Sequence, residues 1–249
     1  MSRASFIPVV DTEREERELR DYLGPEYDRS LLERYDQTLE DEVSEIGDEQ
    51  TLYRTSRAYL YNLTAFAMTG TKLPYLADLA RFVDPPGRIL DYGCGIGSDG
   101  LMLIEAGYRV AFADFDNPST RYLRWRLERR RHEAEVYDLD RDSIPGGFDA
   151  AFAFDVIEHV DDPFAFLARM EELANLVAVN FLDPEPGETA LHRRLPVDEL
   201  VAYAASRTLR RYRRYHGRSH LVVYEPTTGG IAARVRSRLA LRRGRLIAA

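Results

Sequence analysis

Residues 88–100 read RILDYGCGIGSDG, a short apolar segment that ends in an acidic residue and continues into glycines at positions 93, 95 and 97. Glycine adopts positive φ angles at little steric cost, and without a Cβ it lets a ligand approach the backbone closely. A helix that begins after such a loop directs its free N–H groups and the positive end of its dipole toward the bound group. The carboxylate of Asp91 suits a ligand that carries an ammonium group. The segment therefore predicts a ligand-binding loop between a strand and a helix.

Two interpretations of this loop compete. Gly95, Gly97 and Gly100 match the dinucleotide fingerprint G-x-G-x-x-G, and Asp114 follows at a distance that suits a ribose contact. That match alone is weak. The run Asp-x-Gly-x-Gly-x-Gly that begins at Asp91 resembles instead the first motif of the class I S-adenosylmethionine-dependent methyltransferases. In that family the motif holds the methionine part of the cofactor.

Later blocks extend the resemblance over residues 88–224, and each places an acidic residue directly after a predicted strand. These residues are Asp114, the pair Asp138 and Asp140, and Asp155 at the start of the run DVIEH. Ligands in open α/β sheets bind at the carboxyl ends of the strands, so the acidic residues are expected along one edge of the sheet. Four blocks in the order and spacing of the family are far more specific than the glycine loop alone.

The resemblance implies a role for each residue of the cofactor site. Asp114 would accept hydrogen bonds from the ribose hydroxyls, and an acid after the third strand would contact the adenine amino group. Asp138 and Asp140 both fit the adenine contact, with a slight preference for Asp138. The implied cofactor is S-adenosyl-L-methionine, and the expected contacts are Asp91, Gly93, Cys94, Gly95, Gly97, Asp114, Phe115, Asp138, Leu139 and Asp155.

Candidate catalytic residues lie in the run DVIEH. A hydroxyl nucleophile benefits from a general base, and histidine has a suitable pKa, so His159 is the first candidate. Asp155 and Glu158 are further candidates, and His192 and His220 are weaker ones. An alternative role for His159 is to order the loop after the fourth strand. An acceptor that arrives deprotonated would need no base.

Composition restricts the class of protein. The chain has 249 residues and a net charge of −8, and it contains no apolar run near the roughly 20 residues that cross a bilayer. With no signal-peptide pattern at its start, we expect a cytoplasmic protein without membrane contact. The single cysteine, Cys94, excludes an internal disulfide, and with no cysteine or histidine near it we expect no metal site. The overall acidity, and the lack of an Asn-Pro-Pro-aromatic box, disfavour a nucleic-acid substrate.

Alternating strand and helix patterns after residue 88 predict an α/β fold. We expect a doubly wound, seven-stranded, mostly parallel sheet with a C-terminal antiparallel hairpin, preceded by an N-terminal helical layer. Residues 1–84 would form a helical segment or lid packed on the core, residues 85–226 the S-adenosylmethionine-binding methyltransferase core, and residues 227–249 a basic tail.

Local patterns predict helices over 11–23, from Pro25 onward, and over 48–68. The aromatic residues of the third helix are expected in the core, although such layers also close over the cofactor in the small-molecule methyltransferases that the chain resembles. The helix over 119–131 carries many arginines, which predicts a solvated face, and Asp116 could cap that helix.

The leading prediction is an enzyme that transfers a methyl group from S-adenosylmethionine to a small or medium organic acceptor, with secondary metabolism as the expected setting. O-methylation is favoured over N-methylation. The alternatives are a nicotinamide-dependent oxidoreductase and a non-catalytic S-adenosylmethionine-binding partner protein. The sequence leaves open the identity of the acceptor, and also whether the chain forms a homo-oligomer through the N-terminal helices or the basic tail.

Overall fold

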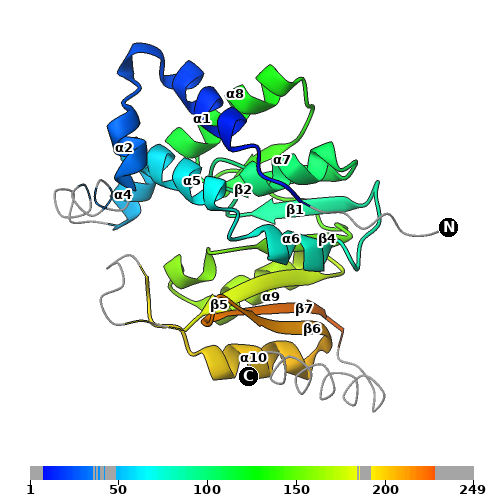
Figure 1. The fold of residues 1–249 in the computed structure, drawn as a ribbon. Helices are drawn as coiled ribbons and strands as arrows, with labels where there is room; N and C mark the ends of the chain where they lie inside the picture. Colours follow the sequence, from blue (N-terminus) through cyan, green and yellow to red (C-terminus); the bar gives the residue numbers. More distant parts are fainter. Residues whose placement is uncertain are drawn as a thin grey trace. The chain divides into compact units, whose positions relative to one another are not determined.

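The computed structural model describes residues 8–35, 37, 39, 42, 49–183, 185 and 192–227 (Figure 1). The predicted basic tail, apart from Thr227, lies outside the described residues. Within the described ranges, no helix is long and apolar enough to cross a membrane.

Strands and helices alternate from residue 88 onward, as the sequence patterns predicted. The strands are β1 (Arg88–Tyr92), β2 (Arg109–Asp114), β3 (Val136–Asp138), β4 (Ala150–Ala153), β5 (Val177–Leu182), β6 (Thr208–Tyr215) and β7 (Ser219–Glu225). The helices are α1 (Thr12–Leu23), α2 (Arg29–Glu33), α4 (Glu49–Thr55), α5 (Ala58–Thr69), α6 (Leu73–Leu79), α7 (Ser98–Glu105), α8 (Pro118–Arg130), α9 (Pro163–Leu173) and α10 (Val197–Ser206), with 3-10 turns η1 (Gly24–Glu26) and η2 (Ile157–His159).

The strands form a seven-stranded sheet in the order β3-β2-β1-β4-β5-β7-β6. The pairs β1–β4, β2–β3 and β4–β5 are parallel, whereas β7 runs antiparallel to both β5 and β6. The predicted fold class, a mostly parallel sheet with a C-terminal antiparallel hairpin and preceding helices, is confirmed. The strand order reverses beside β1, and ligands of open α/β sheets bind outside the carboxyl ends of strands at such a point.

The chain forms two compact units, and each is described by itself. The unit of residues 78–92 and 144–249 contains β1, β4, β5 and the β6–β7 hairpin. The side chains of β4 are all buried, as are those of residues 177–181 in β5, which is the pattern of parallel strands covered on both faces. Helix α10 packs against β5, β6 and β7. The hairpin turns through Gly217, which has a φ of 76°.

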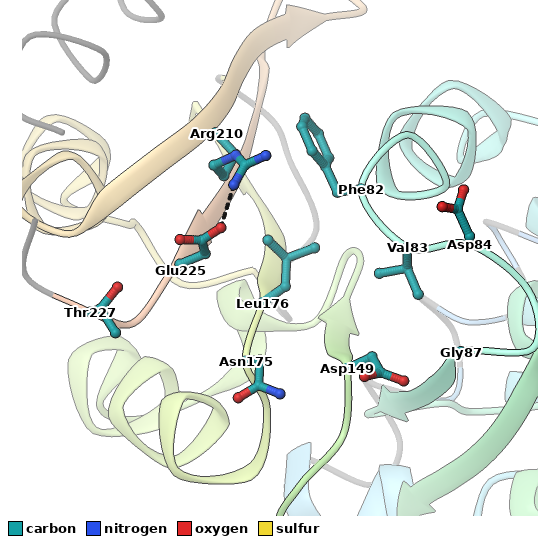
Figure 2. Close-up of a pocket in the computed structure, with 10 residues that line it drawn as sticks. All are labelled: Phe82, Val83, Asp84, Gly87, Asp149, Asn175, Leu176, Arg210, Glu225 and Thr227. Carbon is teal, nitrogen blue, oxygen red and sulfur yellow. Dashed lines mark hydrogen bonds and ion pairs between the residues drawn. The ribbon is translucent and has the colours of Figure 1, made fainter. Parts of the chain in front are cut away.

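A cavity of about 520 Å³ lies in this same unit (Figure 2). Its walls include Gly87, Asp149 and Leu176, the residues that directly precede β1, β4 and β5. Arg210 and Glu225 form an ion pair in another part of the wall. The cavity therefore lies at the amino ends of the parallel strands. Ligands of such sheets bind at the carboxyl ends, so we assign this cavity no part in the predicted site.

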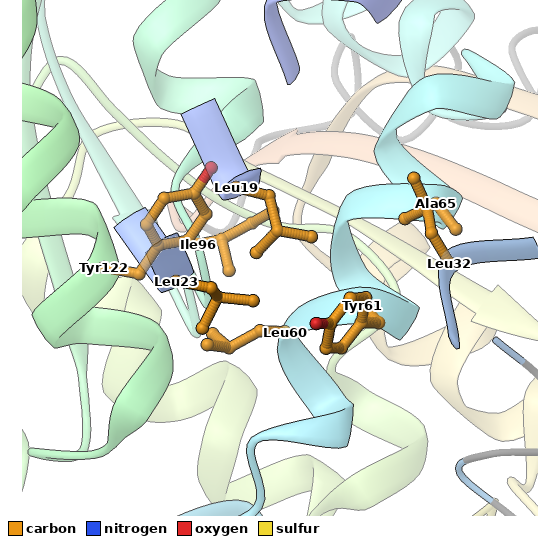
Figure 3. Packing of buried hydrophobic residues seen from close by; sticks show 8 residues of the cluster. All are labelled: Leu19, Leu23, Leu32, Leu60, Tyr61, Ala65, Ile96 and Tyr122. Atoms are coloured by element: carbon orange, nitrogen blue, oxygen red, sulfur yellow. The ribbon is translucent and has the colours of Figure 1, made fainter. Parts of the chain in front are cut away.

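The other unit, residues 1–77 and 93–143, has a hydrophobic core that joins the N-terminal helices to the glycine loop (Figure 3). Its buried members come from α1, α2, α5, α8 and the loop, and they are Leu19, Leu23, Leu32, Leu60, Tyr61, Ala65, Ile96 and Tyr122. Ile96 belongs to the glycine loop and is only 4% exposed. The loop is thus held from one side by the helical layer.

Two predicted helix boundaries in the N-terminal part are wrong. Pro25 lies inside the 3-10 turn η1, which begins at Gly24. The next helix begins only at Arg29, because the Asp28 side chain accepts a hydrogen bond from the Ser30 backbone N–H at 2.8 Å. The helix expected over 48–68 is interrupted at Ser56, whose hydroxyl accepts a hydrogen bond from the Tyr59 backbone N–H at 2.9 Å. Serine and aspartate side chains that bond the backbone in this way favour helix starts over helix interiors.

The cap of α8 also differs from the prediction. Asn117, and not Asp116, is the N-cap, and its side chain accepts a hydrogen bond from the Thr120 backbone N–H at 2.9 Å. The Thr120 hydroxyl in turn accepts a hydrogen bond from the Asn117 backbone N–H at 3.1 Å, which completes a capping box. Asp116 remains exposed and pairs with Arg121 at 3.4 Å.

Candidate functional site

The glycine loop has the backbone conformation that its sequence predicted. Gly93, Gly95 and Gly97 have φ angles of 77°, 53° and 71°. The backbone N–H groups of Gly93 and Cys94 both donate to the carbonyl of Ala113, at 2.8 and 3.2 Å. These bonds join the loop to the carboxyl end of β2. The positive φ angles of the loop and its close backbone contacts explain why these positions are glycine.

Neighbouring side chains leave little room for a Cβ in the loop. A Cβ at Gly97 would lie 2.4 Å from Leu123 Cδ1, and a Cβ at Gly95 would lie 3.1 Å from Leu63 Cδ1. Leu123 is fully buried, so its side chain has little freedom to move away. The glycines are therefore needed for packing as well as for their φ angles.

Asp114, the predicted ribose contact, closes on the same loop. Its Oδ2 accepts a hydrogen bond from the Gly95 backbone N–H, and its Oδ1 accepts one from the Phe115 backbone N–H, both at 2.7 Å. Desolvation raises the pKa of Asp114 above its usual value, although both backbone donors oppose that shift. A carboxylate oxygen accepts more than one hydrogen bond, so each oxygen keeps capacity for a ligand hydroxyl.

The acids after the third strand take different partners. Asp138 faces Asp114 across the β2–β3 ladder and is buried, and its Oδ1 accepts a hydrogen bond from the Asp140 backbone N–H at 3.0 Å. Asp140 instead pairs with Arg54, which lowers the pKa of the Asp140 carboxyl. Arg54 also lies over the Phe115 ring, 4.6 Å from its centroid. The helical layer thus contacts two of the residues expected around the adenine, a link that the sequence did not reveal.

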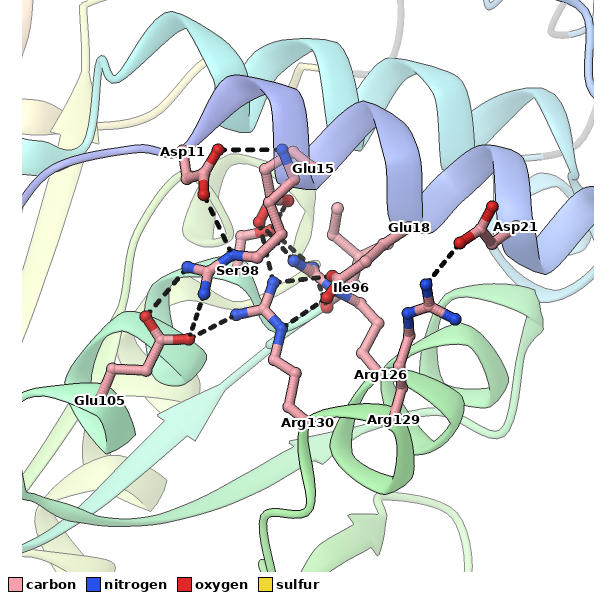
Figure 4. Close-up of polar contacts among 11 residues, drawn as sticks. Asp11, Glu15, Glu18, Asp21, Ile96, Ser98, Glu105, Arg126, Arg129 and Arg130 are labelled. Carbon is pink, nitrogen blue, oxygen red and sulfur yellow. Dashed lines mark hydrogen bonds and ion pairs between the residues drawn. The ribbon is translucent and has the colours of Figure 1, made fainter.

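The sequence predicted that the arginine-rich face of α8 is exposed to solvent. This prediction is wrong for the middle of the face, at Arg126. Arg126 is fully buried, and its guanidinium pairs with Glu15 and Glu18 of α1, the latter at 2.8 Å (Figure 4). The same guanidinium donates to the Ile96 carbonyl at 3.0 Å and to the Ser98 hydroxyl at 2.8 Å. One side chain therefore connects α1 to the glycine loop and to the start of α7.

Arg130 extends this cluster on the side of α7. Its guanidinium pairs with Glu18 at 2.7 Å and with Glu105 at 3.0 Å (Figure 4). Burial alone would raise the pKa of Glu18, but the hydrogen bonds and charges of Arg130 and Arg126 outweigh it, and the pKa of Glu18 is lowered. Buried charges need partners of this kind, because an unpaired ion in a protein interior is strongly destabilising.

In the unit of residues 78–92 and 144–249, Asp91 and Asp155 lie at neighbouring strand ends. Asp91 is 4% exposed and pairs in register with Phe152 of β4, and Asp155 follows that strand by two residues. Asp155 has a φ of 56°, which is uncommon outside glycine and is found at functional sites. Within this unit, the structure brings two of the predicted site residues to the same edge of the sheet.

Asn180 holds Asp155 in this conformation. Its Oδ1 accepts a hydrogen bond from the Asp155 backbone N–H at 2.8 Å, and its Nδ2 donates to Asp155 Oδ1 at 2.7 Å. Nδ2 also donates to the Ser219 hydroxyl at 3.1 Å. The other carboxylate oxygen, Asp155 Oδ2, is buried and has no hydrogen-bond partner in the described part of the chain. That oxygen is suited to accept a hydrogen bond from a ligand.

The remaining catalytic candidates lie in the turn η2. Glu158 is 1% exposed, whereas His159 is half-buried. The ring of His159 meets that of His192, with centroids 4.9 Å apart at 65°. His220, a weaker candidate, lies elsewhere in this unit, where its ring bonds the Tyr212 hydroxyl and Asp183.

Sequence reasoning missed Arg54, Arg126 and Asn180. The acidic pattern of α1 and the basic pattern of α8 were visible, but nothing showed that these helices face each other. Asn180 is a lone polar residue in the otherwise apolar run VAVNFL, and that interruption is the signal that could have marked it.

Comparison with known proteins agrees with the fold and with the motifs. Residues 90–176 match the family model described as a methyltransferase domain. The chain is 37% identical over 76 residues to the glycine N-methyltransferase of Homo sapiens, covering 25% of this chain and 26% of that protein. It is 30% identical over 112 residues to the ubiquinone biosynthesis O-methyltransferase of Xanthomonas campestris pv. campestris, covering 43% and 46%.

Among solved structures, the chain resembles magnesium protoporphyrin IX methyltransferase (ChlM) from Synechocystis PCC 6803 with bound SAH. The TM-score is 0.53 at 15% sequence identity, and the match covers 66% of this chain and 86% of that one. Residues 90–176 form a methyltransferase domain, and the fold is the Rossmann-like fold of the class I S-adenosylmethionine-dependent methyltransferases, so the predicted resemblance is confirmed. The chain spans less than half the length of either curated relative, 26% and 46%.

Proposed function

We propose that this chain transfers a methyl group from S-adenosylmethionine to a small or medium organic acceptor, with O-methylation favoured over N-methylation. The observation that carries the proposal is the ordered set of acidic residues at or just after the ends of four successive strands, Asp91, Asp114, Asp138 and Asp155. The match of residues 90–176 to a methyltransferase domain includes all four.

For the cofactor, we propose the contacts that the family pattern implies. The glycine loop, residues 93–97, and Asp91 would hold the methionine part, Asp114 the ribose, and Asp138 with Leu139 the adenine. The positive φ angles of the loop and the remaining acceptor capacity of Asp114 support these assignments. Phe115, which carries Arg54 over its ring, would offer an apolar surface beside the base.

The chemistry is an in-line displacement at the methyl carbon. The acceptor atom forms a bond to that carbon while the carbon–sulfur bond breaks, and the sulfur keeps the electron pair as S-adenosylhomocysteine. Holding two reactants in this geometry accounts for roughly 7 to 11 kcal/mol of barrier. His159 is the proposed general base for a hydroxyl acceptor, and Asp155 and Glu158 are the proposed neighbours that orient it or the acceptor.

The curated relatives include both an O-methyltransferase and an N-methyltransferase, so they do not decide between oxygen and nitrogen as the methylated atom. The preference for oxygen rests on His159. An amine acceptor that arrives deprotonated needs no base, whereas a hydroxyl gains on the order of 10² to 10⁴ in rate from one. A role in secondary metabolism and a cytoplasmic location remain predictions from the sequence.

Calorimetric titration tests the cofactor. S-adenosylhomocysteine is expected to bind the purified chain with one site, and reduced nicotinamide dinucleotide is expected to give no heat. Binding of the dinucleotide alone would overturn the proposal in favour of an oxidoreductase. Incubation with methyl-labelled S-adenosylmethionine and parallel sets of phenols, carboxylic acids and amines then tests the acceptor class. Cofactor binding without label transfer to any set would favour the non-catalytic partner protein.

A further inference from the structure

A carboxylate and two imidazoles converge after β4, within the unit of residues 78–92 and 144–249. The side chains are those of Glu158, His159 and His192, and one potential metal-ligating atom from each lies within 4.8 Å of the other two. Glu158 is 1% exposed, and both histidines are half-buried. The cluster thus combines one buried carboxylate with two half-buried imidazoles.

Two contacts bring the distant histidine to the turn. The backbone N–H of Arg193 donates to the Glu158 carbonyl at 2.8 Å, and the Arg193 guanidinium pairs with Asp161 at 2.6 Å. The hydrogen bond from the His159 backbone N–H to the Val156 carbonyl, at 3.0 Å, closes the turn from which the other two side chains project. The three side chains are therefore placed by backbone contacts on both sides.

We propose that Glu158, His159 and His192 form a binding site for a divalent transition-metal ion of the Zn²⁺ type. Two imidazoles and one carboxylate are a donor set that holds zinc with a coordination position left for water or an oxygen ligand. Mg²⁺ and Ca²⁺ prefer sites made of oxygen atoms, so the two nitrogen donors select against them. This proposal replaces the sequence-based expectation of no metal site, which considered only the surroundings of Cys94.

The geometry needs a modest adjustment. Nitrogen and oxygen ligands lie at about 2.0–2.2 Å from zinc, which puts two tetrahedral ligands about 3.4 Å apart. Because the ligand atoms lie within 4.8 Å of one another, no pair must approach by more than about 1.4 Å. Small rotations of three side chains around a common centre can supply this change while the backbone contacts stay in place.

Metal binding changes the role of His159, and this consequence rests on the proposed function. A ring nitrogen that holds the ion is not available to take a proton from the acceptor. The ion would instead act as a Lewis acid, because a bound divalent cation makes a coordinated hydroxyl acidic enough to release its proton to water before the oxygen is methylated. An acceptor that uses the site would accordingly carry a hydroxyl group.

Equilibrium dialysis of the full, tag-free chain against Zn²⁺, without cofactor, tests the site. The wild-type chain is expected to bind one ion. His159→Gln, His192→Gln and Glu158→Gln are each expected to weaken binding by more than the roughly 10- to 100-fold that loss of an outer-shell partner costs. The matched control is His132→Gln, since His132 is also half-buried but lies outside the cluster, and this variant is expected to bind as the wild type does.

A measurement on the unsubstituted chain keeps the test valid if a variant fails to fold. On addition of Zn²⁺, the ring-nitrogen NMR signals of His159 and His192 are expected to shift together, while that of His132 stays in place. No zinc binding, binding that survives His192→Gln, or unmoved signals for His159 and His192 would overturn the proposal. Titration of S-adenosylhomocysteine into the same preparation tests the proposed function separately, so the two can fail independently.

Discussion

At the scale of single residues, backbone hydrogen bonds hold Asp114, the proposed ribose contact, in place. Its two oxygens accept hydrogen bonds from Gly95 and Phe115, which fixes the carboxylate beside the glycine loop. An anion positioned by two backbone donors needs little reorganisation to bind a ligand hydroxyl, which supports the proposed ribose contact.

Replacing Asp114 by alanine is therefore expected to weaken binding of S-adenosylhomocysteine by about 1.5 to 3 kcal/mol, the range for hydrogen bonds to a charged group. Calorimetry measures the change. Asp116→Ala is the control, because Asp116 is exposed and its contact is a 3.4 Å pair with Arg121. Equal affinities for the two variants would contradict the ribose contact.

A substitution at Gly97 separates two contributions to stability, the positive φ angle and the packing against Leu123. Gly97→Ala is expected to lower the free energy of unfolding by about 1 to 2 kcal/mol for the left-handed backbone and by about 1 to 3 kcal/mol more for the contact with Leu123. Gly147→Ala is the control, since Gly147 has a φ of 87° and a Cβ there would meet no described atom within 4 Å. Urea denaturation compares the two variants. Equal losses in the free energy of unfolding would show that the Leu123 side chain moves aside at no cost in stability.

At the scale of elements, the contact of α1 with α8 is ionic at its centre and apolar around it. Arg126 and Arg130 meet Glu15 and Glu18 beside the core that contains Leu19 and Tyr122. Because Arg126 also donates to Ile96 of the glycine loop, we expect a change in this contact to alter the loop as well.

Arg126→Met is expected to cost about 3 to 5 kcal/mol of stability, because it leaves buried carboxylates short of a partner. Arg129→Met is the matched control on the same helix, since the Arg129 side chain is 43% exposed, and it is expected to cost no more than about 1 kcal/mol. Urea denaturation measures both. Where Arg126→Met remains folded, its affinity for S-adenosylhomocysteine is expected to fall as well, and similar stability losses for the two variants would contradict the network.

The same contact predicts a dependence of stability on pH. The pKa of Glu18 is lowered in the folded chain, so its contribution is present above the ordinary value of 4.5 and is lost as the pH falls through the folded value. The difference in unfolding free energy between wild type and Glu18→Gln is expected to shrink as urea denaturation is repeated from about pH 7 to about pH 4. A difference that stays constant with pH would show that Glu18 has the same pKa in the folded and unfolded chain, and would contradict this prediction.

At the scale of the whole molecule, a cofactor that binds only the folded chain must stabilise it. S-adenosylhomocysteine at about 100 times its dissociation constant is expected to raise the free energy of unfolding by about 2.7 kcal/mol. Thermal denaturation with and without the ligand measures this as a rise in midpoint temperature. Reduced nicotinamide dinucleotide at the same concentration is the control, and an equal rise with both would contradict the specificity of the site.

The sequence alone determined the features that depend on short stretches of chain. The glycine loop after Asp91, the strand ending at Asp114 and the C-terminal hairpin were all predicted, because glycine freedom, apolar runs and turn residues act over a few positions. The order of these blocks along the chain then indicated the family. Errors at this level were confined to helix ends, where Asp28, Ser56 and Asn117 form local hydrogen bonds that compete with a longer helix.

Only the tertiary structure decided which polar residues are partners. Arg126 is separated by more than a hundred positions from Glu15 and Glu18, so its own helix gave no sign that the guanidinium is buried. Asn180 and Asp155, or His192 and His159, likewise meet only after the sheet and its loops are assembled. The physical reason is that burial of a charge depends on the charges that face it, and that arrangement is a property of packed elements.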